Sequence, residues 1–514
     1  MATVALWLML EEGFPRVYPP YEDAAMLFRY ADNLASGGGL AWNAGESPAV
    51  TDGATDLGFV LVLAALVWLG VQVQVAALAL NTAAVFATGV LLDVMNRRVW
   101  QLPAASLSLV TLVIFSGPAN RYLASGFSPP IFAFIIAAAT VLAALSAAAK
   151  VGGSRWQVLL AASGVCAGIA GWWRPEGFVL SSIMVAPAWL MLAPDRSWRR
   201  LIRPVLLFVV PLVVGGLAWV AFRVGYIGQL LPTSAVMKSG EGIYPGSVLE
   251  AAGLYLLWTA PLTVIVWNRQ KWWARVGWKG LVVVGALLVA AVVWLPVHAT
   301  FNHWERMQWP LVPALAILMV SALSDVAARR AVAGPVPSLT ALVAVGLCMA
   351  LALYSHVGNG YQESPFHTAV SRALSGVDTS SLRLATTEAG LIPLSVSGKA
   401  LDTWGHNDRS LAESRRGTLE QRLQEFEPNV LIVHGFTAPP AFAEIACRSG
   451  GDWSDMVSRL YSYADHHDLR LLRSTAMQQC DFWTVYVGPG VSPDIVDALR
   501  SYRLAGEELV ALPS

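Results

Sequence analysis

Charged residues are scarce in this chain. Only 13% of its 514 residues are Asp, Glu, Lys or Arg, whereas 56% are hydrophobic. Soluble globular domains average about 25% charged residues, so the composition excludes that class. The sequence also has no Gly-rich phosphate loop, nucleophile elbow or nucleic-acid module, which argues against nucleotide-dependent chemistry and a nucleic-acid partner. Long apolar runs fill the chain instead, and they predict a polytopic α-helical membrane protein.

Candidate metal ligands are few as well. His298 and His303 are five residues apart beside a predicted membrane interface, and no Cys or carboxylate cluster has metal-ligand spacing. His466 and His467 lie in a polar stretch that is typical of solvated surface. The sequence therefore predicts neither a metal site nor a cofactor.

Cysteine occurs at only four positions. Cys166 and Cys348 fall inside apolar runs, whereas Cys447 and Cys480 fall in the C-terminal part of the chain. This part is predicted to be extracytoplasmic, where the compartment is oxidising. The second pair is therefore predicted to form a disulfide.

The first ten residues are apolar but lack a basic n-region and a small-residue cleavage site. They are also too short to cross a bilayer, which takes about 20 residues. We interpret them as the outer end of a first transmembrane helix whose beginning is missing.

Ten later apolar runs are long enough to predict membrane-spanning helices. They cover residues 75–94, 102–117, 129–149, 156–172, 177–193, 204–222, 248–267, 280–297, 308–325 and 338–354. Together with the N-terminal fragment they predict about 10–11 transmembrane helices. The run 57–70 is only 14 residues long and would reverse the order of the loops if it crossed, so we expect a shallow helix that re-enters from outside.

The basic residues predict the orientation. Alternate short loops hold 14 Lys or Arg between them. The other loops hold only Arg121, Arg174, Arg223, Lys238 and Arg306. The positive-inside rule makes the first set of loops cytoplasmic and the second set extracytoplasmic.

The chain changes character after Tyr354. The first 354 residues hold 21 Lys or Arg and 15 Asp or Glu, so they are basic. The remaining residues hold 13 Lys or Arg and 19 Asp or Glu, so they are acidic. We therefore predict a transmembrane domain over residues 1–354, with an outer loop at 11–74, and an extracytoplasmic α/β domain over 355–514. Short runs in that domain predict strands at 382–385, 400–403, 430–434 and 482–487 and helices at 418–426 and 493–502.

The outer loop contains an acidic pair, Glu22 and Asp23, at the start of an amphipathic segment that extends to about Leu34. Its apolar face predicts a helix lying at the membrane surface. An acidic pair at such a place is a candidate for general-base chemistry, although Asp and Glu also favour helix N-termini for capping alone.

Three cations share the predicted outer face. Arg174 precedes Pro175 and Glu176, Lys238 ends LLPTSAVMK, and Arg306 lies in HWERMQWPLVP. Each cation also has a non-catalytic explanation. Arg174 could belong to a helix start, and Lys238 could be solvated or contact lipid headgroups. Arg306 could pair with Glu305 or reach lipid phosphate. Several cations around one acidic pair nevertheless favour an anionic phosphate substrate.

The order of these stretches resembles a known family. EDAAMLFRYADNLASGGGLAWNAGE, RPEG, GQLLPTSAVMK, RMQWPLVP, TTEAGLIPLS and ALDTWGHND follow one another as in bacterial membrane glycosyltransferases of the GT-C class. The mycobacterial terminal arabinofuranosyltransferases and their bacterial kin are the relatives we would name. The resemblance covers residues 21–408.

The resemblance implies a polyprenyl-phosphate sugar as donor and a hydroxyl of a glycan, lipid or protein as acceptor. It places the reaction on the outer face of a bacterial inner membrane, with an arabinofuranosyl or mannosyl type of transfer in cell-envelope synthesis. It assigns the catalytic base to Asp23 first and Glu22 second, since the family usually has two aspartates there. Arg306, Lys238 and Arg174 would then bind the donor phosphate.

Two other readings stay open. A transporter or flippase for a lipid-linked glycan would also be polytopic with buried cations, and inverted repeats would support it, although no two matching halves are visible. The chain could also be a catalytically inactive relative that binds glycan, because SGFSPP and DGATDLG depart from the patterns of many relatives.

Overall fold

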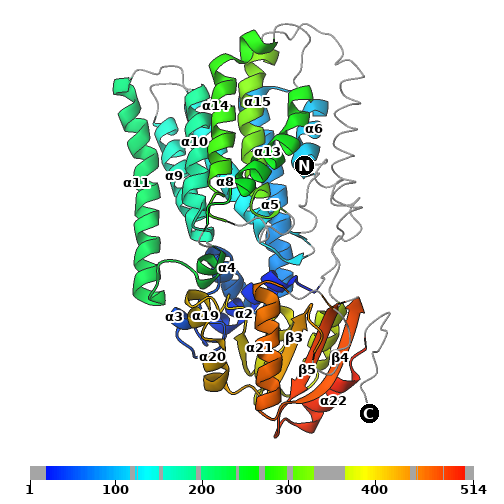
Figure 1. Cartoon of the computed structure of the whole chain (residues 1–514). Coiled ribbons are helices and arrows are strands. Elements are labelled where there is room, and N and C mark those ends of the chain that lie inside the picture. The colour runs from blue at the N-terminus through cyan, green and yellow to red at the C-terminus, as the bar shows by residue number, and fades with distance from the viewer. Residues whose placement is uncertain are drawn as a thin grey trace.

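The computed structural model describes residues 19–503 except 103, 116–121, 124, 150–153, 193–197, 239–241, 266–271, 298–304, 329–364, 440–446, 448–449 and 479. A helical bundle and an α/β unit lie end to end, and short helices lie between them (Figure 1).

Within the described ranges, nine of the ten predicted apolar runs are helical. They form α5 (Val73–Met95), α6 (Ala104–Phe115), α8 (Pro129–Ala148), α9 (Arg155–Trp173), α10 (Gly177–Leu192), α11 (Trp198–Phe222), α13 (Pro245–Ile265), α14 (Trp272–Val292) and α15 (Val312–Ala328). The tenth run, 338–354, and the N-terminal fragment lie outside the described residues. Among the described residues, four stretches are long and apolar enough to cross a membrane: Val73–Trp100, Pro129–Ala148, Arg155–Trp173 and Ile202–Ile227.

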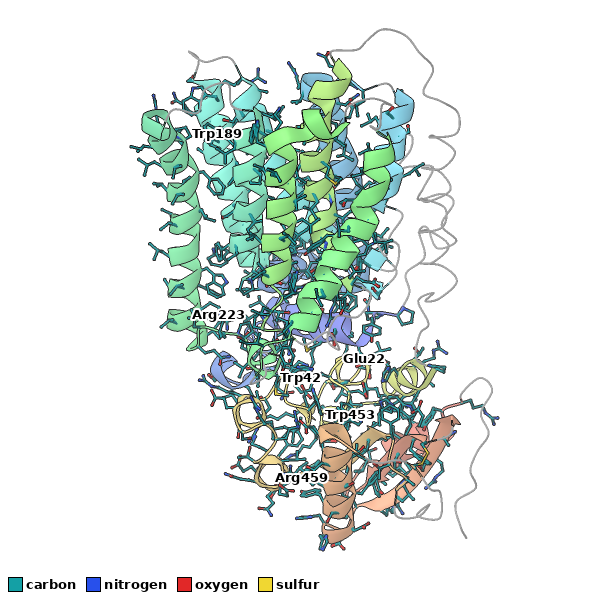
Figure 2. All side chains as sticks on the ribbon, turned by 45° about the horizontal axis from the view of Figure 1, so that its top comes forward. Glu22, Trp42, Trp189, Arg223, Trp453 and Arg459 are labelled. Atoms are coloured by element: carbon teal, nitrogen blue, oxygen red, sulfur yellow. A yellow bond between two sulfur atoms is a disulfide. The ribbon has the colours of Figure 1, made fainter. Side chains whose placement is uncertain are left out.

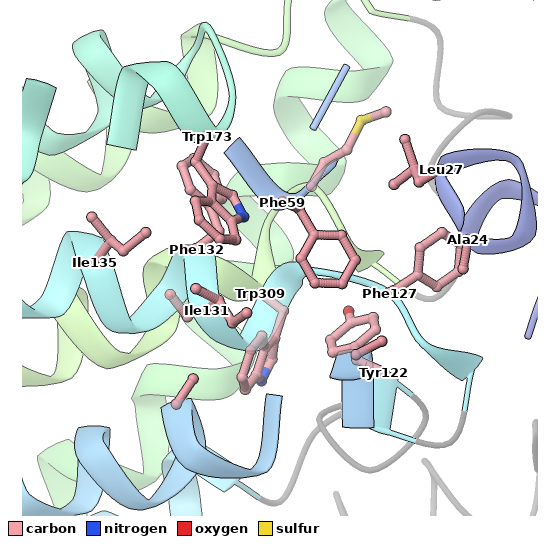
Figure 3. Close-up of a cluster of buried hydrophobic side chains, with 14 of the residues drawn as sticks. Ala24, Leu27, Phe59, Tyr122, Phe127, Ile131, Phe132, Ile135, Trp173 and Trp309 are labelled. Carbon is pink, nitrogen blue, oxygen red and sulfur yellow. The ribbon is translucent and has the colours of Figure 1, made fainter. Parts of the chain in front are cut away.

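Helix α8 lies inside the bundle because it is apolar on every side, a composition that requires burial all round. Fifteen of its side chains are buried, and Pro129 and Pro130 begin the helix, where their missing N–H groups cost nothing. Aromatic rings pack at this end of the bundle (Figure 3), including Phe59 against Trp173 with ring centroids 6.0 Å apart. The end of the bundle nearest the α/β unit is therefore tightly packed with aromatic side chains.

Glycines let α9 approach α11 closely. A Cβ added to Gly164 would lie 2.3 Å from the carbonyl oxygen of Phe208, and one added to Gly215 would lie 3.2 Å from the Cα of Gly168. Between membrane helices the hydrophobic drive is weak, so such small-residue crossings bring backbones into van der Waals contact. The far side of α11 remains open, with Val214 and Leu217 exposed.

Short helices lie between the bundle and the α/β unit (Figure 1). They are α2 (Glu22–Ala35), α3 (Pro48–Thr51), α4 (Leu57–Trp68) and α12 (Thr233–Lys238). Helix α4 fills the predicted run at 57–70 and has 12 residues, about 18 Å, which is too short to cross a bilayer. Its re-entrant path remains a prediction.

The sequence predicts α2 as a helix lying at the membrane surface, with Arg29 among the residues of its polar face. In the structure Arg29 is only 6% exposed. Its guanidinium donates to the carbonyl oxygens of Val396 at 2.8 Å and Gly398 at 3.0 Å, and also to that of Pro393. The α/β unit therefore covers the polar face of α2, which apolar periodicity alone could not show.

The α/β unit contains a five-stranded mixed sheet in the order β2-β1-β3-β5-β4. The strands are β1 (Arg383–Thr386), β2 (Lys399–Asp402), β3 (Val430–Gly435), β4 (Arg470–Gln478) and β5 (Asp481–Val487). Strands β2, β1 and β3 are parallel, β5 pairs antiparallel with β3, and β4 pairs antiparallel with β5 at the edge of the sheet. Four of these strands match the predicted runs, whereas β4 was missed because its sequence RLLRSTAMQ mixes charged and apolar residues without strict alternation.

Helices cover both faces of the sheet. The predicted helices are present as α20 (Leu419–Phe426) and α22 (Pro493–Ser501), and the sequence interpretation missed α17 (Pro365–Leu374) and α21 (Asp452–His466). Leu431 and Val433 of β3 pack in one cluster with Leu423 and Leu460, and Ile432 packs in another with Phe366. Both faces of β3 are buried, which explains why its sequence is continuously apolar.

Cys447 and Cys480 form the predicted disulfide, at a sequence separation of 33. Closing a loop of this length stabilises a fold by about 3 to 4 kcal/mol in the chain-entropy model. Replacing both cysteines with serine is therefore expected to lower the free energy of unfolding of the α/β unit by that amount, measured by denaturant titration. Equal stability of the double variant and the oxidised parent would contradict a stabilising role.

Candidate active site

The first turn of α2 directs its two carboxylates to different partners. Adjacent residues on a helix point about 100° apart, so Glu22 and Asp23 cannot face the same way. Asp23 is ion-paired with Arg306, whereas Glu22 accepts hydrogen bonds from the backbone N–H groups of Gly390 at 2.7 Å and Leu391 at 3.1 Å. Asp23 thus faces the bundle and Glu22 faces the α/β unit.

Arg306 is held at the end of the bundle. Its side chain is 7% exposed, against 33% for Asp23, and its guanidinium lies 5.0 Å from the ring centroid of Phe127. Glu305, directly before it, has a φ of 55°, which is uncommon for a residue other than glycine and marks a sharp change of direction. The pair therefore places a partly exposed carboxylate beside a buried, aromatic-backed cation.

Arg174 lies at the same cavity. It follows the last residue of α9, and its guanidinium contacts Glu176 at 2.6 Å and Asp56 at 3.4 Å. Asp56 also accepts a hydrogen bond from the buried hydroxyl of Ser128. The cavity is lined by Asp23, Met26, Leu27, Thr55, Asp56, Phe127, Pro129, Arg174, Arg306 and Met307. Two cations and two carboxylates therefore share one cavity with apolar walls.

Lys238 is the last residue of α12, and its side chain lies outside the part of the chain that the structure describes. The beginning of α12 is anchored to the outer loop, because Thr233 donates its N–H to the carbonyl oxygen of Asp52 at 2.7 Å and Ser234 donates to that of Gly53 at 2.6 Å. The Asp52 carboxylate in turn pairs with Arg223 at 2.7 Å, and both side chains are almost fully buried. This ion pair fixes the loop that leads to Lys238.

Glu22 lies where the bundle meets the α/β unit (Figure 2) and belongs to a second group of ionisable side chains. Its Oε1 lies 3.1 Å from Nδ1 of His367 on α17, and Nε2 of His367 lies 3.5 Å from Oε2 of Glu388 after β1. Glu388 also contacts Nδ1 of His434 at 2.8 Å, and Nε2 of His434 contacts Asp481 at 3.1 Å. Carboxylates and imidazoles thus alternate from α2 across the sheet.

Burial and neighbouring charge set the protonation of this group. Burial raises the pKa of Glu22, and the charge of Glu388 raises it further, although His367 opposes both. Burial would also raise the pKa of Glu388, but hydrogen bonds to His367 and His434 lower it below its ordinary value. Burial lowers the pKa of His434, yet its contacts with Asp481 and Glu388 raise it to about 9. Glu388 is therefore the carboxylate that stays ionised most readily.

Three of the five site residues predicted from sequence, Asp23, Arg306 and Arg174, line one cavity. Glu22 is turned away from that cavity. The sequence interpretation missed Asp56, which lies within the DGATDLG stretch, and Glu388, which lies within TTEAGLIPLS. It also missed His367 and His434, because neither stands in a recognisable motif and only the fold brings them to residue 22.

No protein-family model matches the chain. A curated relative, a triacylglyceride transporter of Mycolicibacterium smegmatis, is 29% identical over 199 residues, which cover 37% of this chain. The matched part is 32% of that relative, so the chain spans about a third of its length.

Solved structures resemble nearly the whole chain. ArnT from Cupriavidus metallidurans bound to undecaprenyl phosphate has a TM-score of 0.61 at 12% identity and covers 95% of this chain and 97% of its own. The apo structure of the same ArnT has a TM-score of 0.59 at 14% identity and covers 94% of this chain and 97% of its own. The arabinofuranosyltransferase AftD from Mycobacteria gives 0.45 at 13% identity, covering 95% of this chain and 40% of AftD. The chain has the GT-C fold that its sequence resemblance predicted.

Proposed function

We propose that this GT-C-fold protein transfers one sugar from a polyprenyl phosphate to an acceptor hydroxyl of a glycan, lipid or protein. The observation that carries the proposal is the pairing of Asp23 with Arg306 in a cavity that also holds Arg174. A carboxylate and two cations at the end of an apolar bundle match what this reaction requires: a proton acceptor, an anion site and a lipid-compatible surface. ArnT, which shares the fold, binds undecaprenyl phosphate.

The proposed reaction gives each group one task. Asp23 takes the proton of the acceptor hydroxyl as that oxygen forms a bond to the anomeric carbon of the donor sugar. The bond from the anomeric carbon to the phosphate oxygen breaks, and its electron pair leaves with the polyprenyl phosphate. Arg306 and Arg174 stabilise the charge that develops on that phosphate, and Lys238 is the third candidate for this task.

The Asp23–Arg306 ion pair provides a way to link donor binding to base activity. A phosphate that enters the cavity competes with Asp23 for the Arg306 guanidinium, since arginine binds carboxylate and phosphate with the same geometry. Donor binding would therefore release Asp23 to accept a proton. Glu22 remains the second candidate for the base, although its carboxylate is engaged by the loop at Gly390 and Leu391.

A panel of donors tests the proposal. Membranes containing the protein are offered several radiolabelled polyprenyl-phosphate sugars, including arabinofuranosyl and mannosyl donors, and the label in cell-envelope acceptors is measured. We expect one donor to transfer its label, and membranes containing Asp23→Asn to transfer almost none. Equal transfer by the parent and Asp23→Asn membranes would contradict the assigned site.

A transporter is the second candidate, because the curated relative that matches 37% of the chain is named a triacylglyceride transporter. Transport of a lipid moves it across the bilayer and breaks no bond. Sugar transfer releases polyprenyl phosphate, so the two functions differ in the products they leave.

The proposed site requires the α/β unit and the first turn of α2 to lie on the extracytoplasmic side of a bacterial inner membrane. The 14 basic residues of the opposite loops support this orientation. Cysteines introduced near Ser47 and near Ser414 should react with an impermeant thiol reagent in intact spheroplasts, and a cysteine near Ser197 should not. The opposite labelling pattern would reverse the topology.

A further inference from the structure

Three potential metal ligands from distant parts of the chain converge where α2 meets the α/β unit. They are Glu22 at the start of α2, His367 on α17 and Glu388 after β1, and one ligand atom from each lies within 4.8 Å of the others. Their side chains are 12% to 14% exposed, so this is an enclosed group rather than a surface patch. We propose that Glu22, His367 and Glu388 form a zinc-binding site, referred to below as the junction site.

The donor set fits zinc. One imidazole nitrogen and two carboxylate oxygens are the ligand types that zinc accepts, and three protein ligands leave a fourth position for water. Zinc bonds of about 2.0 to 2.1 Å imply ligand atoms about 3.3 Å apart at the corners of a tetrahedron. The 3.1 Å contact between Nδ1 of His367 and Oε1 of Glu22 lies close to that value, whereas the 3.5 Å contact of Glu388 is with Nε2, the other nitrogen of the same ring.

Only one imidazole nitrogen of His367 can bind the ion, so one carboxylate must turn toward it. The ligand atoms lie within 4.8 Å of one another, at most about 1.5 Å beyond the tetrahedral edge. Rotation of a glutamate side chain covers such a distance without movement of the backbone, because each of its torsions has several staggered positions.

Outer partners hold the ligands in place, as is usual around metal ions. The N–H groups of Gly390 and Leu391 donate to Glu22. His434 contacts the second oxygen of Glu388 at 2.8 Å and is itself held by Asp481 and by stacking on Trp483, with ring centroids 4.0 Å apart. The backbone contacts restrict Glu22 before an ion binds, which lowers the entropy cost of binding, so Glu388 is the carboxylate that turns toward Nδ1 of His367.

The charge of the group favours a cation. Three carboxylates, Glu22, Glu388 and Asp481, outnumber the two imidazoles in a largely buried place, and a buried carboxylate without compensating positive charge is costly. A divalent ion at the junction site supplies that charge. It would also join the first turn of α2, and thus Asp23, to two segments of the α/β unit.

Metal content tests this inference independently of sugar transfer. The full chain is purified in detergent, stripped with a chelator, incubated with zinc chloride and desalted, and its zinc is measured by mass spectrometry. We expect one zinc per chain in the parent, and little or none in His367→Gln and Glu388→Gln. His434→Gln should weaken zinc binding by about 10-fold to 100-fold, because it supports Glu388 without being a ligand. His466→Gln is the matched control, since this exposed histidine contacts the carbonyl oxygen of Ser462, and it should bind zinc like the parent.

Thermal unfolding separates loss of a ligand from loss of the fold. Zinc should raise the Tm of the stripped parent and of His466→Gln, because an ion that binds only the folded state stabilises it. It should leave the Tm of folded His367→Gln and Glu388→Gln unchanged. A parent that binds no zinc, that binds only calcium or magnesium, or that binds zinc equally after both substitutions would overturn the inference. A zinc-binding protein without transferase activity would refute the proposed function and leave the junction site standing.

Discussion

Asp23→Asn is expected to reduce sugar transfer by roughly 100-fold to 10,000-fold, because it keeps the shape of the side chain and removes the proton acceptor. Binding of the donor should persist, since the proposed mechanism assigns the phosphate to Arg306 and Arg174 and the lipid to apolar surface. Initial rates at saturating donor, together with donor binding measured separately, would show this division between turnover and affinity.

Asp32→Asn on the same helix is the matched control for this prediction. Asp32 lies near the C-terminal end of α2, away from the cavity residues, so the same chemical change there should leave transfer close to the parent rate. Glu22→Gln should cost less than Asp23→Asn if Asp23 is the base, and more if the two carboxylates exchange roles. Near-normal transfer by folded Asp23→Asn, Glu22→Gln and the double variant would mean that the pair is structural.

Arg223→Met is expected to lower the free energy of unfolding by about 3 to 5 kcal/mol, because it leaves the buried Asp52 carboxylate without its cation. The pair is 2.7 Å apart, and the two side chains are 1% and 0% exposed. Burial already raises the pKa of Asp52, and Arg223 is the main group that opposes this effect. Denaturant titration of the detergent-purified protein measures this loss in the free energy of unfolding.

The double variant Arg223→Met with Asp52→Asn should recover part of that stability, because no unpaired charge then remains. Arg97→Met supplies the comparison with an exposed ion pair. Arg97 contacts Asp93 at 2.9 Å but is 76% exposed, so its loss should change stability by less than about 1 kcal/mol. Similar losses for Arg223→Met and Arg97→Met would contradict the argument from burial.

The sequence predicted those parts of the fold that depend on local pattern. The apolar runs located nine helices of the bundle in the described ranges, and turn and strand signals located four strands of the sheet. The Cys447–Cys480 disulfide was predicted because only two cysteines lie outside the apolar runs. Strand β4 was missed because its residues do not follow the two-residue alternation that a half-exposed strand shows.

The candidate site was predictable only in part, for a physical reason. Asp23, Arg174 and Arg306 are charges at the ends of apolar segments, and charge is so costly there that the pattern itself indicates function. The group of Glu22, His367 and Glu388 leaves no such pattern, because 345 residues separate the first two and each alone is an ordinary polar residue. The expectation of no metal site rested on spacing along the chain, which cannot detect ligands that only the tertiary fold assembles.

The covering of α2 is a second feature that required the structure. Arg29 on α2 donates to carbonyl oxygens at residues 393, 396 and 398, and Tyr30 donates to Asn407 at 2.8 Å. These contacts come from residues more than 360 positions away. They make the α/β unit part of the support of Asp23, so substitutions in this unit should affect turnover even though it lies outside the cavity.

Release of polyprenyl phosphate by the purified protein in proteoliposomes tests the central claim most directly. Vesicles carry the donor identified by the panel, and free polyprenyl phosphate is measured by mass spectrometry with and without the acceptor. We predict acceptor-dependent release by the parent and by Asp32→Asn, with release by Asp23→Asn reduced by at least about 100-fold. Movement of intact donor across the bilayer without release of polyprenyl phosphate would contradict the claim and identify a transporter.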